Sequence, residues 1–199
     1  MSFPDFFAAA PRIILNDPLA RFLGAGDGTM EYAYADAVRL AGHSCPTVAS
    51  AYVMTRAALR ALYPSATPER GAIRVELAAE RTEGVAGVMA NVAALVTGAA
   101  GDGGFKGIGR RFDRRGLLVF GAAIDGQMRF TRLDTGDAVN ASANLERVPS
   151  DPRMPSLLPA CVNGTATAEE AALFGALWQA RVRKILLEHA DDPQTIVLH

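Results

Sequence analysis

The spacing of the apolar residues changes twice in the middle of the chain, and this change limits the possible folds more than any other feature. Residues 46–63 place apolar side chains along one helical face, and Pro64 stops the helix. Residues 72–78 alternate apolar and charged side chains, as in a strand with one buried face. Residues 85–98 return to helical spacing, and Gly98 is placed to end that helix. A helix, a strand and another helix therefore form the centre of the predicted fold.

Further elements are predicted on both sides of this unit. A helix is expected at residues 30–40, after a glycine-rich loop. Residues 117–124 and 127–133 are predicted to be the two arms of a hairpin, because Asp125-Gly126 between them is a strong signal for a two-residue turn. The central strand is expected to pair with this hairpin.

The end of the chain divides into a loop-rich segment and a long helix. Residues 134–164 contain several prolines and are predicted to be mostly loops. Residues 168–189 are predicted to be helical, with Thr167 and Glu170 as a capping box at the start. The apolar side chains expected on the buried face of this helix are Phe174, Leu177, Trp178, Val182, Ile185 and Leu186.

The order of these elements predicts an α+β fold, with helices packed on a mostly antiparallel sheet and a long C-terminal helix added to it. Half of the residues are hydrophobic, which is enough to build a sizeable core. The expected organisation is an N-terminal extension at residues 1–29 and an α+β core at 30–133. A third segment, residues 134–199, is expected to pack on that core.

The charge balance and the lack of a long apolar run exclude several partners. The chain has 20 basic and 21 acidic residues, so no basic excess indicates a nucleic-acid partner. No apolar run is long enough to cross a bilayer, and we expect no membrane partner. The first residues do not resemble a signal peptide, and the two cysteines, Cys45 and Cys161, fit free thiols or metal ligands in a reducing compartment. We therefore expect a cytoplasmic protein.

Gly42-His43-Ser44-Cys45-Pro46 is the segment with the clearest chemical meaning. Because proline is favoured at the first position of a helix, Pro46 predicts that a helix begins there and that Cys45 is its N-cap. The helix dipole would favour a thiolate at that place. With the histidine two residues earlier, the pair is half of a tetrahedral zinc site or a nucleophile with its base. Alternatively, the cysteine is a small buried side chain and the histidine a loop residue.

The sequence GHSCPTVASAYVMTRAAL, with the strand, helix and hairpin that follow it, resembles the FmdE-like family of formylmethanofuran dehydrogenase proteins over roughly residues 30–133. His43 and Cys45 match the family's Gly-His-x-Cys-Pro motif. The resemblance implies an α+β core with a bound metal, usually zinc, and often a homodimer. The chain resembles a divergent member without the C-terminal zinc finger of some relatives. Three positions that carry Cys, Asp and Cys in fuller members hold other residues here: Val88, Asn91 and Ala99.

Few other residues could complete a metal site. The sequence has 3 histidines and 2 cysteines in all. Glu83 is the predicted third ligand or a general base, although capping of the helix after it is an alternative. A site with four His or Cys ligands would need Cys161, His189 or His199 to come close. We therefore predict an open site on the motif pair and Glu83, with water or substrate in the remaining positions.

Two kinds of function agree with these residues. One is a metal-binding protein, with zinc as the expected metal, that acts on or binds a small molecule. The other is a non-catalytic accessory or cofactor-handling subunit, in which the metal is structural or a haem or another transition metal is bound. An open site with bound water favours the first function, and a closed site with four ligands favours the second. The long C-terminal helix and the high apolar fraction also predict a homodimer.

Overall fold

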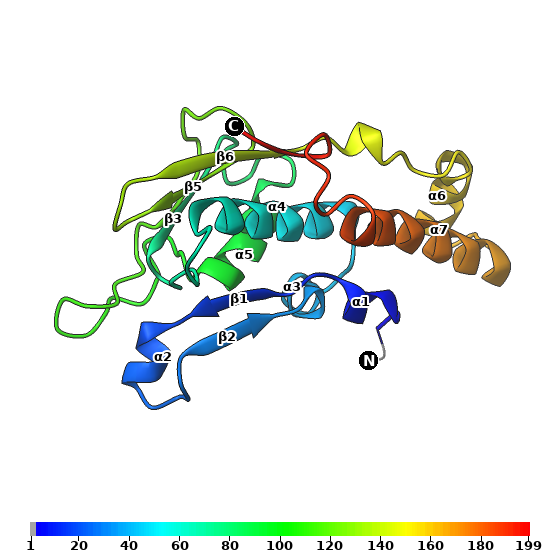
Figure 1. Cartoon of the computed structure of the whole chain (residues 1–199). Coiled ribbons are helices and arrows are strands. Elements are labelled where there is room, and N and C mark those ends of the chain that lie inside the picture. Colours follow the sequence, from blue (N-terminus) through cyan, green and yellow to red (C-terminus); the bar gives the residue numbers. More distant parts are fainter. Residues whose placement is uncertain (1–2) are drawn as a thin grey trace.

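The computed structural model describes residues 3–199 and shows an α+β fold, as predicted (Figure 1). A five-stranded sheet lies at the top of the view, α4 and α5 pack beneath it, and the β1–β2 hairpin lies below these helices (Figure 1). Within the described part of the chain, no helix is long and apolar enough to cross a membrane. The helices are α1 (Phe6–Ala9), α2 (Pro18–Phe22), α3 (Tyr34–Ala41), α4 (Pro46–Leu62), α5 (Ala86–Thr97), the 3-10 turn η1 (Leu145–Arg147), α6 (Met154–Val162) and α7 (Ala168–Leu187). The strands are β1 (Ile13–Asn16), β2 (Thr29–Tyr32), β3 (Ile73–Leu77), β4 (Leu118–Val119), β5 (Met128–Arg132), β6 (Ala138–Ala143) and β7 (Ile196–Leu198).

The large sheet is mostly antiparallel, as expected. Its strand order is β4-β3-β5-β6-β7, and only the pair of β3 and β4 is parallel. Ile73, Val75 and Leu77 of β3 are buried, whereas the residues between them are more exposed. This alternation confirms the strand predicted at residues 72–78.

The hairpin predicted around Asp125-Gly126 is wrong. Its two expected arms lie on opposite sides of β3, where Val75 faces Leu118 of β4 on one side and Phe130 of β5 on the other. A turn dipeptide reports only the local backbone, so it does not reveal a third strand between the arms. The hairpin that does form joins β5 to β6, one strand further along the chain.

The helix α4 is enclosed on all sides. Its bounds, Pro46–Leu62, agree with the predicted helix. Residues 48–55 are buried without interruption, so the helix buries every face rather than the single apolar stripe that was expected. The large sheet packs on one side of α4. On another side the hydroxyl of Tyr52 donates to the carbonyls of Pro11 and Tyr32, at 2.7 and 2.8 Å, and joins α4 to the N-terminal hairpin.

The N-terminal region adds a hairpin that the sequence analysis did not predict. Residues 30–40 were expected to be one helix, but Thr29–Tyr32 is strand β2, and α3 begins only at Tyr34. The strand pairs antiparallel with β1 and crosses the predicted boundary between extension and core. The strand forms because β1, a distant segment, supplies its hydrogen-bond partners, and spacing within residues 30–40 cannot show that partner.

A buried ion cluster holds this hairpin against the core. Asp17 is 3% exposed and caps α2 by accepting from the backbone N–H groups of Leu19 and Ala20. Its carboxylate also accepts from Arg70 at 2.9 Å and from Arg114 at 2.7 Å, and we call these three side chains the Asp17 cluster. Burial alone would raise the pKa of Asp17, but the hydrogen bonds from the two arginines and Ala20 outweigh it, so the pKa lies below its usual 3.8.

The segment that was predicted to be mostly loops contains a strand and a helix, β6 and α6. Pro155 lies in the first turn of α6, where its missing N–H removes no helical hydrogen bond. Pro159 lies inside the same helix, where it removes one backbone hydrogen bond. The prolines led to the prediction of a loop, but this short helix contains two of them.

The helix α7 agrees with the predicted element, and the predicted capping box at its start is present. Its C-terminal half is buried through three side chains: Val182, Ile185 and Leu186. Its N-terminal half packs on α6, and the two helices project from the side of the sheet (Figure 1). The predicted buried face is therefore wrong for this half, where three of its side chains remain partly exposed: Phe174, Leu177 and Trp178.

Candidate functional site

The predicted motif lies in the short connection between α3 and α4. Gly42 ends α3 with a backbone φ of 75°, a left-handed conformation that suits glycine. Cys45 is the N-cap of α4, as predicted, and its Sγ accepts from the N–H of Val48 at 3.4 Å. The thiol is buried at the first turn of the helix, with the residue 8% exposed.

His43 lies on the surface, in contrast to Cys45. Its Nδ1 is 3.0 Å from the carbonyl oxygen of Ala41. A carbonyl can only accept, so Nδ1 carries a proton, and in the neutral ring Nε2 then keeps its lone pair. A metal-binding histidine commonly has this arrangement, with the second nitrogen held by a carbonyl.

The third predicted ligand does not join this pair. Glu83 is exposed in the turn before α5, where its Oε2 accepts from the backbone N–H of Glu80 at 3.1 Å. Among residues 3–199, no three His, Cys, Asp or Glu side chains come close enough together to hold a metal ion. His43 and Cys45 are thus two possible ligands, whereas a catalytic zinc site usually has three from the protein. The described residues do not form a complete zinc site by themselves.

The other candidate ligands serve different roles. Cys161 is a free, half-buried thiol on α6. His189 follows α7, and its Nδ1 lies 3.1 Å from a carboxylate oxygen of Asp192. His199 exchanges backbone hydrogen bonds with Asn140 next to the end of β7. None of them supplies the ligand missing beside the motif.

Ser44, the residue between His43 and Cys45, connects the motif to α7. Its backbone carbonyl accepts from Nε1 of Trp178 at 3.0 Å and from Nε2 of Gln179 at 3.2 Å. Its hydroxyl donates to Oε1 of Gln179 at 2.9 Å and lies 2.9 Å from the hydroxyl of Tyr34. Burial raises the pKa of Tyr34, so this phenol remains protonated and donates to the serine oxygen. The conformation of the motif is therefore fixed from both sides.

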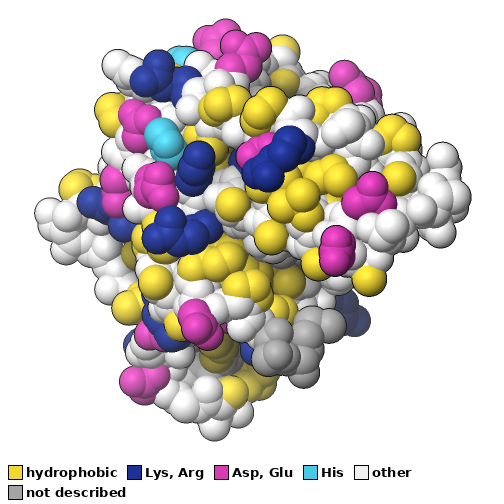
Figure 2. Space-filling view, turned by 90° about the vertical axis from the view of Figure 1, so that its right-hand side faces the viewer, with side chains coloured by type: hydrophobic (Ala, Val, Ile, Leu, Met, Phe, Trp, Pro, Cys, Tyr) yellow, Lys and Arg dark blue, Asp and Glu magenta, His cyan; other side chains and the backbone are white. Residues whose placement is uncertain are grey.

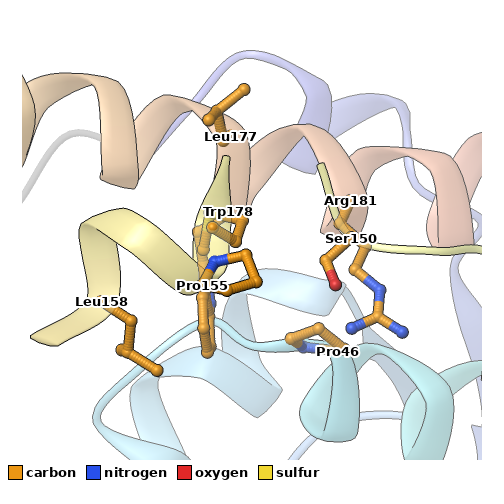
Figure 3. Close-up of a pocket in the computed structure, with 8 residues that line it drawn as sticks. Pro46, Ser150, Pro155, Leu158, Leu177, Trp178 and Arg181 are labelled. Atoms are coloured by element: carbon orange, nitrogen blue, oxygen red, sulfur yellow. The ribbon is translucent and has the colours of Figure 1, made fainter. Parts of the chain in front are cut away.

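A cavity of about 300 Å³ opens beside this connection, between α6, α7 and the start of α4 (Figure 3). Most of its wall is apolar, and the indole of Trp178 forms part of it. The polar side chains of the wall are Ser150 and Arg181, which lie together on the side opposite Leu158 (Figure 3). The complete lining is Pro46, Ser150, Met154, Pro155, Leu158, Leu177, Trp178 and Arg181.

Arg181 is held in place by backbone carbonyls. Its Nε donates to the carbonyl of Val148 at 2.6 Å, and its Nη2 donates to that of Leu145 at 3.1 Å. Within residues 3–199 no carboxylate lies within ion-pair distance of the guanidinium, and burial lowers its pKa. The cavity therefore contains a half-buried positive charge that no acidic side chain of the described chain neutralises.

No protein-family model, curated protein or solved structure matches this chain. The similarity to the FmdE-like family therefore remains a prediction from the motif and the order of the elements. The chemistry of the site has to be argued from its own geometry.

Sequence analysis did not find the cavity. Its polar residues, Ser150 and Arg181, stand 31 positions apart in the sequence, and Pro46 is more than a hundred positions away from both. Arg181 falls in a run of charged residues near the end of a predicted helix, where cations are common. One signal was present: α6 carries no charged residue at all, which is unusual for a surface segment.

Proposed function

We propose that this protein binds a small molecule in the cavity between α4, α6 and α7. One observation carries the proposal: the cavity is apolar over most of its wall, yet contains the guanidinium of Arg181 without an acidic partner among the described residues. Ligand cavities commonly combine an apolar wall with a few placed polar groups. Its volume of about 300 Å³ lies at the small end of the range for such cavities.

The position of the cavity relates it to the motif. Pro46, which follows Cys45 directly, forms part of the wall. Trp178 also lines the cavity while its Nε1 holds the carbonyl of Ser44. A molecule that moves the indole would therefore also act on the segment that carries His43 and Cys45.

Binding can be tested with anilinonaphthalene sulfonate, a fluorescent dye that carries one anionic group on an apolar body. We expect saturable binding of one dye molecule per chain. Leu158→Phe places a larger side chain in the cavity wall and should weaken binding by about tenfold or more. The matched control is Leu133→Phe, an exposed residue after β5 that lies outside both the cavity lining and the α6–α7 pair, and it should bind as the wild type does. Equal loss in both variants, or no saturable binding to the wild type, would refute the proposal.

A second candidate function is metal binding at His43 and Cys45, and zinc is the metal that we propose. The supporting observation is that His43 directs Nδ1 to a carbonyl and so keeps a lone pair on exposed Nε2. Cys45 lies at the start of α4, where its Sγ accepts from the N–H of Val48. Since these are the two candidate ligands in the motif, the other positions would be filled by water, a bound molecule or a second copy of the chain. In the cytoplasm, where we propose that the protein works, both thiols stay reduced.

Metal content per chain tests this candidate. We expect Cys45→Ser to lower zinc occupancy far more than Cys161→Ser, because a neutral hydroxyl replaces a thiolate poorly. The second variant is a matched control, since Cys161 is the only other thiol. Equal occupancy in the wild type and both variants, or no zinc in a wild type prepared without chelator and offered zinc, would show that the motif is structural.

We also propose that the protein forms a homodimer through the projecting α6–α7 pair. Figure 2 shows this end of the molecule, with hydrophobic side chains gathered near the middle of the face. Leu158, Val162 and Leu173 are 43%, 73% and 36% exposed there, and α6 has no charge to keep it in water. Light scattering should give twice the 21.0 kDa chain mass, and a constant monomer mass over a range of concentrations would contradict the proposal.

A further inference from the structure

Arg181 and Arg129 are the half-buried arginines that form no ion pair within residues 3–199, and Arg129 donates instead to the amide oxygen of Asn140 and does not line the cavity. Four arginine side chains that are at most 17% exposed each form an ion pair with an aspartate. These arginines are Arg56, Arg70, Arg114 and Arg132. The protein thus places a carboxylate beside each of these arginines, with Arg70 and Arg114 sharing Asp17, because a covered charge without a counter-charge is costly. Arg181 is half-buried, and within residues 3–199 its partners are two neutral carbonyls.

The two carbonyls leave one part of the guanidinium free. Nε and Nη2 of Arg181 are occupied by Val148 and Leu145, whereas Nη1 has no hydrogen-bond partner in the described chain. Ser150 lines the same side of the cavity, and its hydroxyl also has no partner among the described residues. Figure 3 shows this hydroxyl and the guanidinium at the same end, away from Leu158. Ser150 is exposed, and it and Arg181 also line a shallower hollow next to Glu146, so the two donors lie where the cavity meets that hollow.

The rest of the wall determines what the remainder of a ligand must be like. Pro46, Pro155, Leu158 and the indole of Trp178 offer apolar surface and no second cation. A phosphate ester carries up to two charges and would exceed what one arginine neutralises. One carboxylate matches one guanidinium in charge, and it can accept a charged hydrogen bond from the free Nη1.

Resting on the small-molecule function proposed above, we propose that the cavity takes a monocarboxylic acid with a compact apolar body. Its carboxylate accepts hydrogen bonds from Nη1 of Arg181 and from the hydroxyl of Ser150. Its hydrocarbon or aromatic part lies against Trp178, Leu158 and Pro155. The lowered pKa of Arg181 agrees with this assignment, because a bound carboxylate would restore the stabilisation that the guanidinium lacks.

The test compares three probes with the same hydrocarbon chain: octanoate, octanol and octylamine. Trp178 is the single tryptophan of the sequence and lines the cavity, so tryptophan fluorescence reports binding at this place alone. We expect octanoate to bind about tenfold more tightly than octanol, and octylamine more weakly than either, from the gain or loss of one charged hydrogen bond. This comparison needs only the wild-type protein.

Variants test which residues cause the preference for octanoate over octanol. Arg181→Met should remove the preference for octanoate over octanol while octanol still binds, and Ser150→Ala should reduce the preference by a few fold. The matched control is Arg183→Met on the same helix, where the arginine is exposed and pairs with Glu188, and it should keep the preference. Equal affinity for octanoate and octanol, or a preference that survives Arg181→Met, would overturn the ligand class while binding itself remains. If none of the three probes binds, the small-molecule function fails as well.

Discussion

Covered arginines have different partners in two regions of the molecule. In the Asp17 cluster the partner is a carboxylate, and in the cavity around Arg181 the partners are neutral carbonyls. In the cluster, Arg70 and Arg114 share the carboxylate of Asp17, which lies at their centre and is itself 3% exposed. At the cavity, Arg181 is held only by carbonyl dipoles within the described chain, and its free edge faces an open volume. The first arrangement places a carboxylate beside both arginines without any other molecule, although Nε of Arg114 is buried there without a hydrogen-bond partner. In our proposal the second is completed by a carboxylate that enters from solution, and this contrast would distinguish a structural arginine from a binding one.

The largest effect is expected from Asp17→Asn, which would break the complete arrangement. This change leaves two covered guanidinium groups without a carboxylate, and we expect it to lower the free energy of unfolding by about 3–5 kcal/mol. Urea unfolding followed by circular dichroism measures the loss.

Asp113→Asn is the control for this prediction. Asp113 pairs with Arg115 on the surface, where the two side chains are 44% and 48% exposed. Its loss should lower the free energy of unfolding far less than the loss of Asp17, because an exposed ion pair is screened by water. Similar losses in both variants would mean that the Asp17 cluster contributes no more than a surface pair.

Acid should remove the difference between the wild type and Asp17→Asn. Burial opposes the charge of Asp17, but its hydrogen bonds from Arg114 and Arg70 hold the folded-state pKa below 3.8. Such a group contributes its full stability above the unfolded-state pKa and loses it as the pH falls through the lower folded-state value. The gap in unfolding free energy between the two proteins should therefore be constant near neutral pH and narrow progressively below pH 3.8. A gap that stays the same in acid would mean that the charge of Asp17 is not what stabilises the cluster.

Between the two regions, the smaller effect on stability is expected from Arg181→Met. The variant loses two hydrogen bonds to carbonyls but also removes a half-buried charge without a counter-charge. These changes oppose each other, and we expect the unfolding free energy to move by less than about 2 kcal/mol. The same urea experiment applies to it. A loss as large as that of Asp17→Asn would show that Arg181 is a structural arginine, and the contrast between the two regions would disappear.

The elements that the sequence predicted correctly are those whose signals are local. The N-cap at Cys45, the helix between Pro46 and Pro64 and the alternation along β3 are all encoded within a few neighbouring residues. The errors occurred where the structure of a segment depends on pairing with a distant segment. β3 separates the two strands that Asp125-Gly126 was predicted to join, and β1 makes a strand of residues that were assigned to a helix.

The candidate site was predictable only in part, for the same reason. His43 and Cys45 stand out because they are two residues apart beside a helix start, and the structure places Cys45 there. Glu83 was selected by its position in the sequence and lies in a separate turn. Arg181 and Ser150 come together because α7 folds back along α4 and the segment before α6 crosses it, and no spacing within either segment indicates this.

Pro159 weakens the helix that forms one wall of the cavity. It lies within α6, so the carbonyl of Pro155 one turn earlier lacks the N–H that would otherwise bind it, and α6 is held by one hydrogen bond fewer than a regular helix. The same helix forms one wall of the cavity through Met154, Pro155 and Leu158. The helix that forms this wall is therefore held by fewer backbone hydrogen bonds than a regular helix of its length. Brief opening of α6 would speed both the arrival and the departure of a ligand while leaving the contacts of the closed cavity unchanged.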